Sequence, residues 1–173
     1  MSEYAPGEEY KEHEAAEGEP IAADKLGQAQ PLINVFGEPN IRKIFSRTWG
    51  LREEGITNIE DEILNQNKYD PAAAFVGGVG VARNTVSDKI SGVGQRSIQL
   101  IKNLCNGMTP NLSHQQQKEV TLHGDHIVSA LVEKLGDNLA KVRQNTENAL
   151  LAMCHHDAFG PQAPITHILR SVG

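Results

Sequence analysis

The sequence predicts an all-α fold built as a short array of stacked helical hairpins. Aromatic residues make up only 5% of the chain, and no alternating apolar runs are bounded by hairpin turns, which argues against a β-sandwich or barrel. Residues 136–154 place apolar side chains at three- and four-residue steps, as one amphipathic helix does. Looser copies of this segment, each with a polar turn and an apolar stripe, occur at 88–105 and 47–59. Such recurrence indicates stacked repeats.

The acidity of the chain is confined to its N-terminal end. Residues 1–30 carry eight acidic and two basic residues, whereas residues 31–173 carry fourteen of each. We expect residues 1–30 to be a disordered acidic tail and residues 31–173 to be the helical array. The tail is either simply solvated or an arm that orders against a partner.

A neutral array argues against several function classes. Nucleic-acid binding needs a basic stripe, no apolar run is long enough to cross a bilayer, and the N-terminus is unlike a signal peptide. Cys105 and Cys154 end two repeat helices, where we expect buried thiols rather than a disulfide. We therefore expect a cytosolic protein with neither nucleic acid nor membrane among its partners.

The first hairpin is expected over residues 31–64. Residues 31–36 are apolar and end at Gly37, after which Glu38-Pro39 begins a short helix. A turn at 46–48 leads to a return helix over 49–64, which carries apolar or small residues at a spacing of four: Leu51, Gly55, Ile59 and Ile63.

The second hairpin begins with Asp70 and Pro71, an N-cap followed by proline at the first helical position. The helix over 72–86 is apolar nearly all round, as expected between two neighbours. Its Gly78-x-Gly80 does not predict a phosphate loop, because no strand precedes it and a third glycine is missing. A turn at 87–89 leads to a return helix over 90–105.

The third hairpin follows a loop or linker expected over residues 106–119, where glycine, proline and three consecutive glutamines occur. Residues 120–135 form its outgoing helix, 136–138 its turn and 139–154 its return helix. Residues 164–172 open a fourth hairpin with no return helix. This leaves an apolar stripe unpaired: Ile165, Ile168, Leu169 and Val172.

Equivalent return-helix positions at Leu51, Val93 and Val142 lie 42 and 49 residues apart. Helical pairs at about 40–47 residues are typical of HEAT-type α-solenoids. We attribute the longer step to the expected loop at 106–119. The fold class is therefore a HEAT-repeat solenoid of about three hairpins and a partial fourth.

No residues with catalytic or metal-ligand spacing are apparent. His123 and His126 lack further ligands, and the histidines of Cys154–Asp157 fall at a helix end, where they interact with carbonyls. We expect no enzyme activity, no metal and no cofactor.

Basic and polar residues recur instead at the three turns before the return helices. Because stacked hairpins place their turns side by side, these residues should form one edge that binds an acidic protein surface. Trp49 is either an anchor of that surface or a core residue, and each charge is either a contact or an ordinary solvated group. The residues are Arg47, Trp49 and Arg52; Lys89 and Arg96; and Asn138, Lys141 and Arg143.

The string Phe45-Ser-Arg-Thr-Trp-Gly-Leu-Arg-Glu-Glu-Gly-Ile56, together with Asp88-Lys89 and residues 137–143, resembles the TOG (tumour-overexpressed-gene) domain family over residues 31–172. The resemblance, greatest to ciliary and centriolar members, implies a HEAT array that binds tubulin through its intra-repeat turns. We therefore expect the tubulin-binding residues to be Trp49, Arg52, Lys89, Asn138, Lys141 and Arg143.

The chain also departs from the family pattern. Gly50 stands where a basic residue often follows the tryptophan, Gly92 and Gly94 replace larger residues, and the repeats amount to about half a TOG domain. The expected function is a non-catalytic module of the cilium, axoneme or centriole that binds tubulin or the microtubule lattice. The alternative is a HEAT-type scaffold of an axonemal or other assembly that docks a different protein through its fourth-repeat helix.

Overall fold

The computed structural model describes residues 16–173 and confirms the all-α class. The expected tail therefore lies outside the described residues up to position 15. No helix in the described range is both long and apolar enough to cross a membrane. After a short 3-10 helix, η1 (Ala23–Lys25), the helices are α2 (Leu26–Phe36), α3 (Glu38–Ile44), α4 (Trp49–Leu64), α5 (Pro71–Thr85), α6 (Ser91–Gly107), α7 (His114–Lys134), α8 (Ala140–His155) and α9 (Gln162–Val172).

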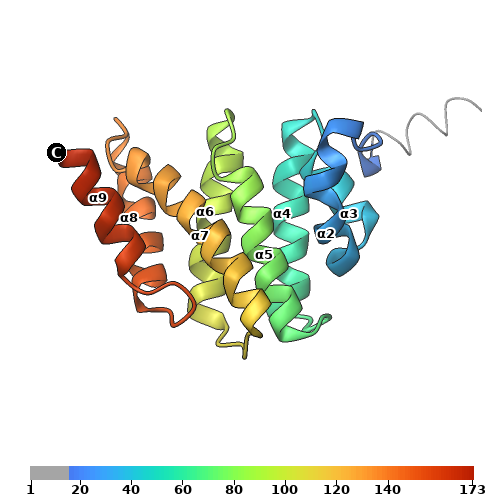
Figure 1. The fold of residues 1–173 in the computed structure, drawn as a ribbon. Coiled ribbons are helices and arrows are strands. Elements are labelled where there is room, and N and C mark those ends of the chain that lie inside the picture. The colour runs from blue at the N-terminus through green and yellow to red at the C-terminus, as the bar shows by residue number, and fades with distance from the viewer. Residues whose placement is uncertain (1–15) are drawn as a thin grey trace, which may run out of the picture.

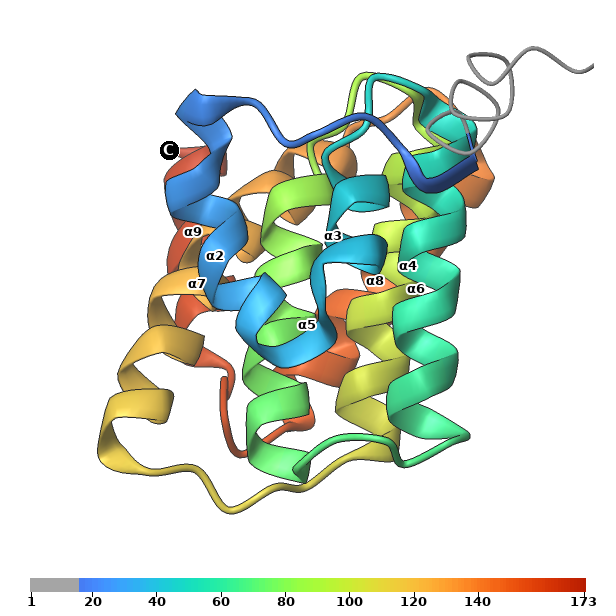
Figure 2. The same cartoon turned by 90° about the vertical axis from the view of Figure 1, so that its right-hand side faces the viewer.

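The helices form two layers of a solenoid. Helices α2, α5, α7 and α9 follow one another along one layer, while α4, α6 and α8 line the other. Figure 2 looks along the array and shows the return helices stacked behind one another on one side. The chain thus has three hairpins, α2/α3–α4, α5–α6 and α7–α8, and α9 begins a fourth, as the sequence predicts.

The core lies between the layers and contains the apolar stripes of both. Phe75, Ile98 and Leu131 are among its fully buried side chains. The glycines of α5 serve close packing: a Cβ at Gly77 would lie 2.7 Å from the Phe36 ring, and one at Gly78 would lie 2.8 Å from Leu104. Packing thus explains the small residues of α5 without a phosphate loop.

The array begins earlier than the expected boundary at residue 31. Helix α2 starts at Leu26, and Ala29 and Leu32 are buried against the core. Pro31 lies inside this helix. The sequence did not predict the first turn of α2, which contains Leu26 and Ala29, because it falls within the acidic composition of residues 1–30.

The expected linker over 106–119 is wrong. Helix α7 begins at His114, with Ser113 as its N-cap, so the connection is only residues 108–113. The longer repeat step arises because α7 has 21 residues whereas α5 has 15. The glutamines that suggested a linker form the first turn of this helix.

Candidate functional site

The three intra-repeat turns, 45–48, 86–90 and 135–139, share one backbone geometry. In each, the N-cap residue of the return helix has φ near −85° and ψ between 111° and 119°. Its N–H donates to a side-chain oxygen two residues earlier, at 2.8–3.1 Å. The N-caps are Thr48, Ile90 and Leu139, and the acceptors are Ser46, Asp88 and Asp137.

This shared geometry fixes which residues are equivalent. Counting from the N-cap, Arg47 corresponds to Lys89 and Asn138, which form the turn tips. Trp49 corresponds instead to the first helical residue of α6 and α8. The three turns lie side by side along one edge of the array (Figure 1), so equivalent residues repeat along that edge.

Large apolar side chains are exposed at these turns. Trp49 is 54% exposed, Ile90 40% and Leu139 62%, so core packing does not account for Trp49. Sequence reasoning missed Ile90 and counted Leu139 only as part of the apolar stripe of the helix predicted over 139–154. The missed signal was the apolar residue in the same N-cap position of two repeats. We call the exposed set the ridge: Arg47, Trp49, Lys89, Ile90, Asn138, Leu139 and Lys141.

The return helices begin at the ridge without side-chain caps. Neither α4, α6 nor α8 has a side chain that accepts a hydrogen bond from its first turn. The first N–H groups of a helix have no partner within it and carry partial positive charge. The three helix ends therefore add to the positive potential of Arg47, Lys89 and Lys141.

Arg52 is an internal bridge rather than a free ridge residue. Its guanidinium donates to both carboxylate oxygens of Asp88, at 2.8 and 3.0 Å, and to the carbonyls of Ser46 and Arg47. The two charged side chains are only 17% and 11% exposed. Arg52 therefore joins the first turn to the second.

Arg143, the residue equivalent to Arg52, holds its own turn in the same way. It donates to the carbonyls of Asp137 and Asn138 at 2.6 and 3.0 Å. The second repeat has Gly94 here, and a Cβ at this position would lie 3.7 Å from Lys134 Nζ. The side chain of Arg143 is exposed, unlike that of Arg52.

Arg96, also expected at the turns, lies between α4 and α6 instead. It pairs with Glu60 and donates to Thr57 Oγ1 at 3.1 Å. Its guanidinium therefore stabilises the stacking of two return helices.

The segment before η1 is attached to the first turn. Glu19 accepts hydrogen bonds from the Ser46 hydroxyl at 2.8 Å and the Arg47 N–H at 2.5 Å. Burial raises the pKa of Glu19, but these hydrogen bonds and the Arg47 charge outweigh it and lower the pKa overall. Arg42 donates to the carbonyls of Gly18 and Glu19. Residues 18 and 19 are thus joined to the array next to the ridge.

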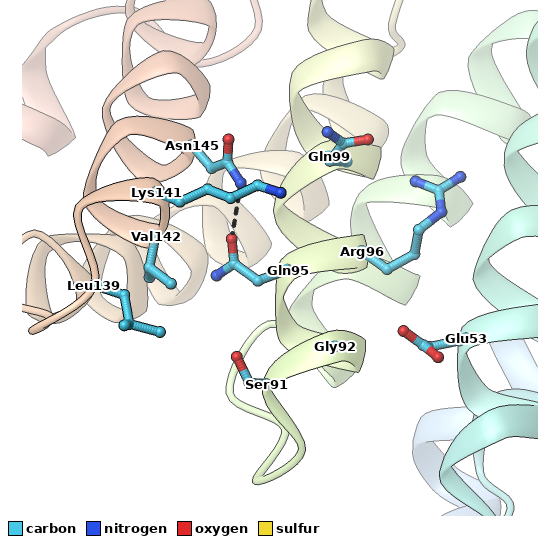
Figure 3. A pocket seen from close by; sticks show the side chains of 10 residues that line it. All are labelled: Glu53, Ser91, Gly92, Gln95, Arg96, Gln99, Leu139, Lys141, Val142 and Asn145. Carbon is cyan, nitrogen blue, oxygen red and sulfur yellow. Dashed lines mark hydrogen bonds between the residues drawn. The ribbon is translucent and has the colours of Figure 1, made fainter.

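A groove of about 400 Å³ continues from the ridge along the outer face of α6 and α8. Figure 3 shows Lys141 extending from α8 above the hydrogen bond between Asn145 and Gln95. Leu139 and Ser91 mark the end of the groove nearest the ridge. Its remaining lining residues are Glu53, Gly92, Arg96, Gln99 and Val142.

The histidines have structural surroundings. His156 donates from Nε2 to the Met108 carbonyl at 2.7 Å, accepts the Ala158 N–H at Nδ1 and stacks on Phe75. Burial lowers the pKa of His123, and the neighbouring Arg83 charge lowers it further. Among residues 16–173, no three or more His, Cys, Asp or Glu side chains are grouped as metal ligands. Burial also raises the pKa of the free Cys105 thiol to about 12.

Comparison with known sequences assigns the family. Residues 26–158 match the family described as the TOG domain of centrosomal protein CEP104. The chain belongs to this family. TOG domains are HEAT-repeat solenoids of a tubulin-binding family, so the HEAT-type fold expected from the repeat spacing is confirmed.

The curated relatives of this TOG chain are much longer. The human centrosomal protein of 104 kDa is 25% identical over 142 residues, which cover 79% of this chain and 15% of the relative. The rat protein is 24% identical over 144 residues, covering 80% and 15%. The chain thus spans about 15% of the length of these relatives.

Two solved structures share the TOG fold. The TOG domain of human Cep104 superposes with a TM-score of 0.65 at 18% identity, over 90% of this chain and 69% of that one. A second CEP104 TOG domain gives a TM-score of 0.64 at 22% identity, over 84% and 58%. In this TOG chain, the intra-repeat turns are the edge that forms the ridge.

Proposed function

We propose that the protein is a non-catalytic tubulin-binding module and that the ridge is its tubulin contact. The observation that carries the proposal is the exposed Trp49 at the first of three adjacent turns whose helices begin uncapped. The turn segments 45–52, 86–94 and 135–143 carry five basic and two acidic residues, which suits an acidic partner. Membership of the TOG family supports tubulin as that partner.

The structure sharpens the contact set proposed from the sequence. Trp49, Lys89, Asn138 and Lys141 are exposed and remain the proposed contacts, joined by Ile90 and Leu139. Arg52 acts by positioning turns, because its guanidinium is occupied internally. Arg143 combines both roles, since it fixes its turn yet is exposed.

The relatives are named as centrosomal proteins, which supports a proposed site of action at the centrosome, on cytoskeletal microtubules. The wider expectation of a centriole, cilium or axoneme rests on the sequence resemblance. Binding to free tubulin and binding to the lattice both place the ridge against a tubulin surface.

Co-migration with tubulin on gel filtration tests the proposal. Trp49→Ala and Lys141→Glu should each abolish co-migration, because they remove an exposed aromatic anchor and reverse an exposed charge. Since neither side chain is buried, helical circular dichroism should match the wild type. Unchanged co-migration of both variants would contradict the proposal.

A second function, docking of a non-tubulin protein, is favoured by the α9 surface. Ile165, Ile168, Leu169 and Val172 form one stripe and are 38–78% exposed. If this stripe is the main binding surface, truncation after Cys154 should remove partner binding while ridge variants retain it.

A further inference from the structure

We propose that the groove between α6 and α8 binds an extended acidic peptide segment of a protein partner. The proposal goes beyond the ridge and does not depend on the partner being tubulin. Its amides, Gln95, Gln99 and Asn145, are not among the proposed tubulin contacts, whereas Lys141 belongs to both surfaces.

The spacing of the groove residues matches an extended chain. Gln95 and Gln99 are four residues apart on α6, and Lys141 and Asn145 are four apart on α8. Four helical residues rise about 6 Å, and two residues of extended chain span about 6.6 Å. Each wall therefore presents one polar group for every second residue of a bound peptide.

The amides carry unused hydrogen-bonding groups of both kinds. Asn145 Nδ2 donates to Gln95 Oε1 at 3.0 Å. This bond leaves the Gln95 nitrogen as a donor and the Asn145 oxygen as an acceptor, and neither has a partner in the described part of the chain. Gln99 is exposed and makes no side-chain hydrogen bond within residues 16–173. Gln95, Asn145 and Gln99 together therefore offer both donors and acceptors to a peptide main chain.

The charges select acidic side chains on the α8 side of the groove. Lys141 is exposed, has no ion pair in the described residues and reaches across towards α6 (Figure 3). Arg96 is neutralised by Glu60. Glu53 belongs to α4 and lies on the far side of α6, beside Gly92, where a Cβ would come within 2.7 Å of its carboxylate. Because alternate side chains of an extended chain point to opposite sides, carboxylates at every second position should face Lys141.

The test uses the full chain and a fluorescent octapeptide of alternating glutamate and serine, with binding followed by polarisation. We expect saturable binding that weakens about threefold to tenfold in Gln99→Ala, as loss of one hydrogen bond predicts. Lys141→Ala should weaken binding and flatten its salt dependence. The same peptide with alternate backbone amides N-methylated should bind less tightly than the parent, because main-chain donors are lost.

Matched controls separate this groove from the ridge and from general charge attraction. Gln144→Ala removes an exposed glutamine of α8 outside the groove and should leave affinity unchanged. Trp49→Ala should also retain the peptide, even where tubulin binding is lost, so the two proposals fail separately. Absence of peptide binding would overturn the inference. It would also be overturned if Gln99→Ala bound the peptide as tightly as the wild type does and the N-methylated peptide bound as tightly as its parent.

Discussion

The two ends of the same hairpins are built differently. At the edge opposite the ridge, Asp70 accepts the Ala73 N–H at 3.0 Å to cap α5, and Ser113 and Gln116 form a reciprocal capping box on α7. At the ridge, the return helices of these two hairpins begin at Ile90 and Leu139, which provide no cap and are largely exposed.

This difference separates stability from recognition. An N-cap side chain typically contributes about 1 kcal/mol, and the outgoing helices have it where the chain only needs to turn. The return helices α6 and α8 lack it and expose an apolar residue in its place. We infer that the ridge retains unbonded donors and apolar surface for a partner, at a cost in stability.

Breaking the Arg52–Asp88 bridge should have the largest effect, because it should change both the stability of the fold and the binding of tubulin at the ridge. Arg52→Ala leaves a mostly buried carboxylate unpaired, which should lower the free energy of unfolding by about 2–4 kcal/mol. It should also weaken tubulin binding, since the first two turns lose their link. Thermal unfolding followed by circular dichroism, with tubulin co-migration alongside, measures both.

Arg52→Lys is the matched control, because lysine keeps the charge but not the bidentate geometry. Its loss of stability should be intermediate. A melting temperature of Arg52→Ala equal to that of the wild type would show that the bridge does not hold the turns.

Removing the cap at the opposite edge should have a smaller and purely structural effect. Ser113→Ala should lower the free energy of unfolding by about 1 kcal/mol, because the first turn of α7 loses its side-chain acceptor. Tubulin binding should be unchanged. If tubulin affinity fell as well, the two edges would not be functionally distinct.

Much of the fold follows from local sequence signals. The return helix predicted at 49–64 is observed with those limits, and Asp70-Pro71 opens α5 as predicted. These signals are local: a proline at the first turn, or apolar residues at a spacing of four. Ser113-x-x-Gln116 is an equally local signal for α7, but the polar composition around it favoured a linker.

The candidate site was less predictable, because the role of each side chain depends on which residues it contacts in the folded chain. Arg52 and Arg96 are basic residues near turns, and only their contacts with Asp88 and Glu60, 36 residues away in each case, show that they are internal. Leu139 fits an apolar helical stripe in sequence. Its exposure follows from its place at the N-cap, which the backbone geometry of the turn determines.

The most direct test of the ridge is to remove its two exposed apolar N-cap side chains. The double variant Ile90→Ser with Leu139→Ser should keep the free energy of unfolding within about 1 kcal/mol of the wild type, because both side chains are exposed and the hydroxyl of Thr48 at the equivalent position forms no cap. The same variant should bind tubulin at least about tenfold more weakly, since two apolar contacts are lost. Chemical denaturation and a tubulin titration on one preparation measure both. Unchanged tubulin affinity in this folded variant would contradict the assignment of the ridge as the binding surface.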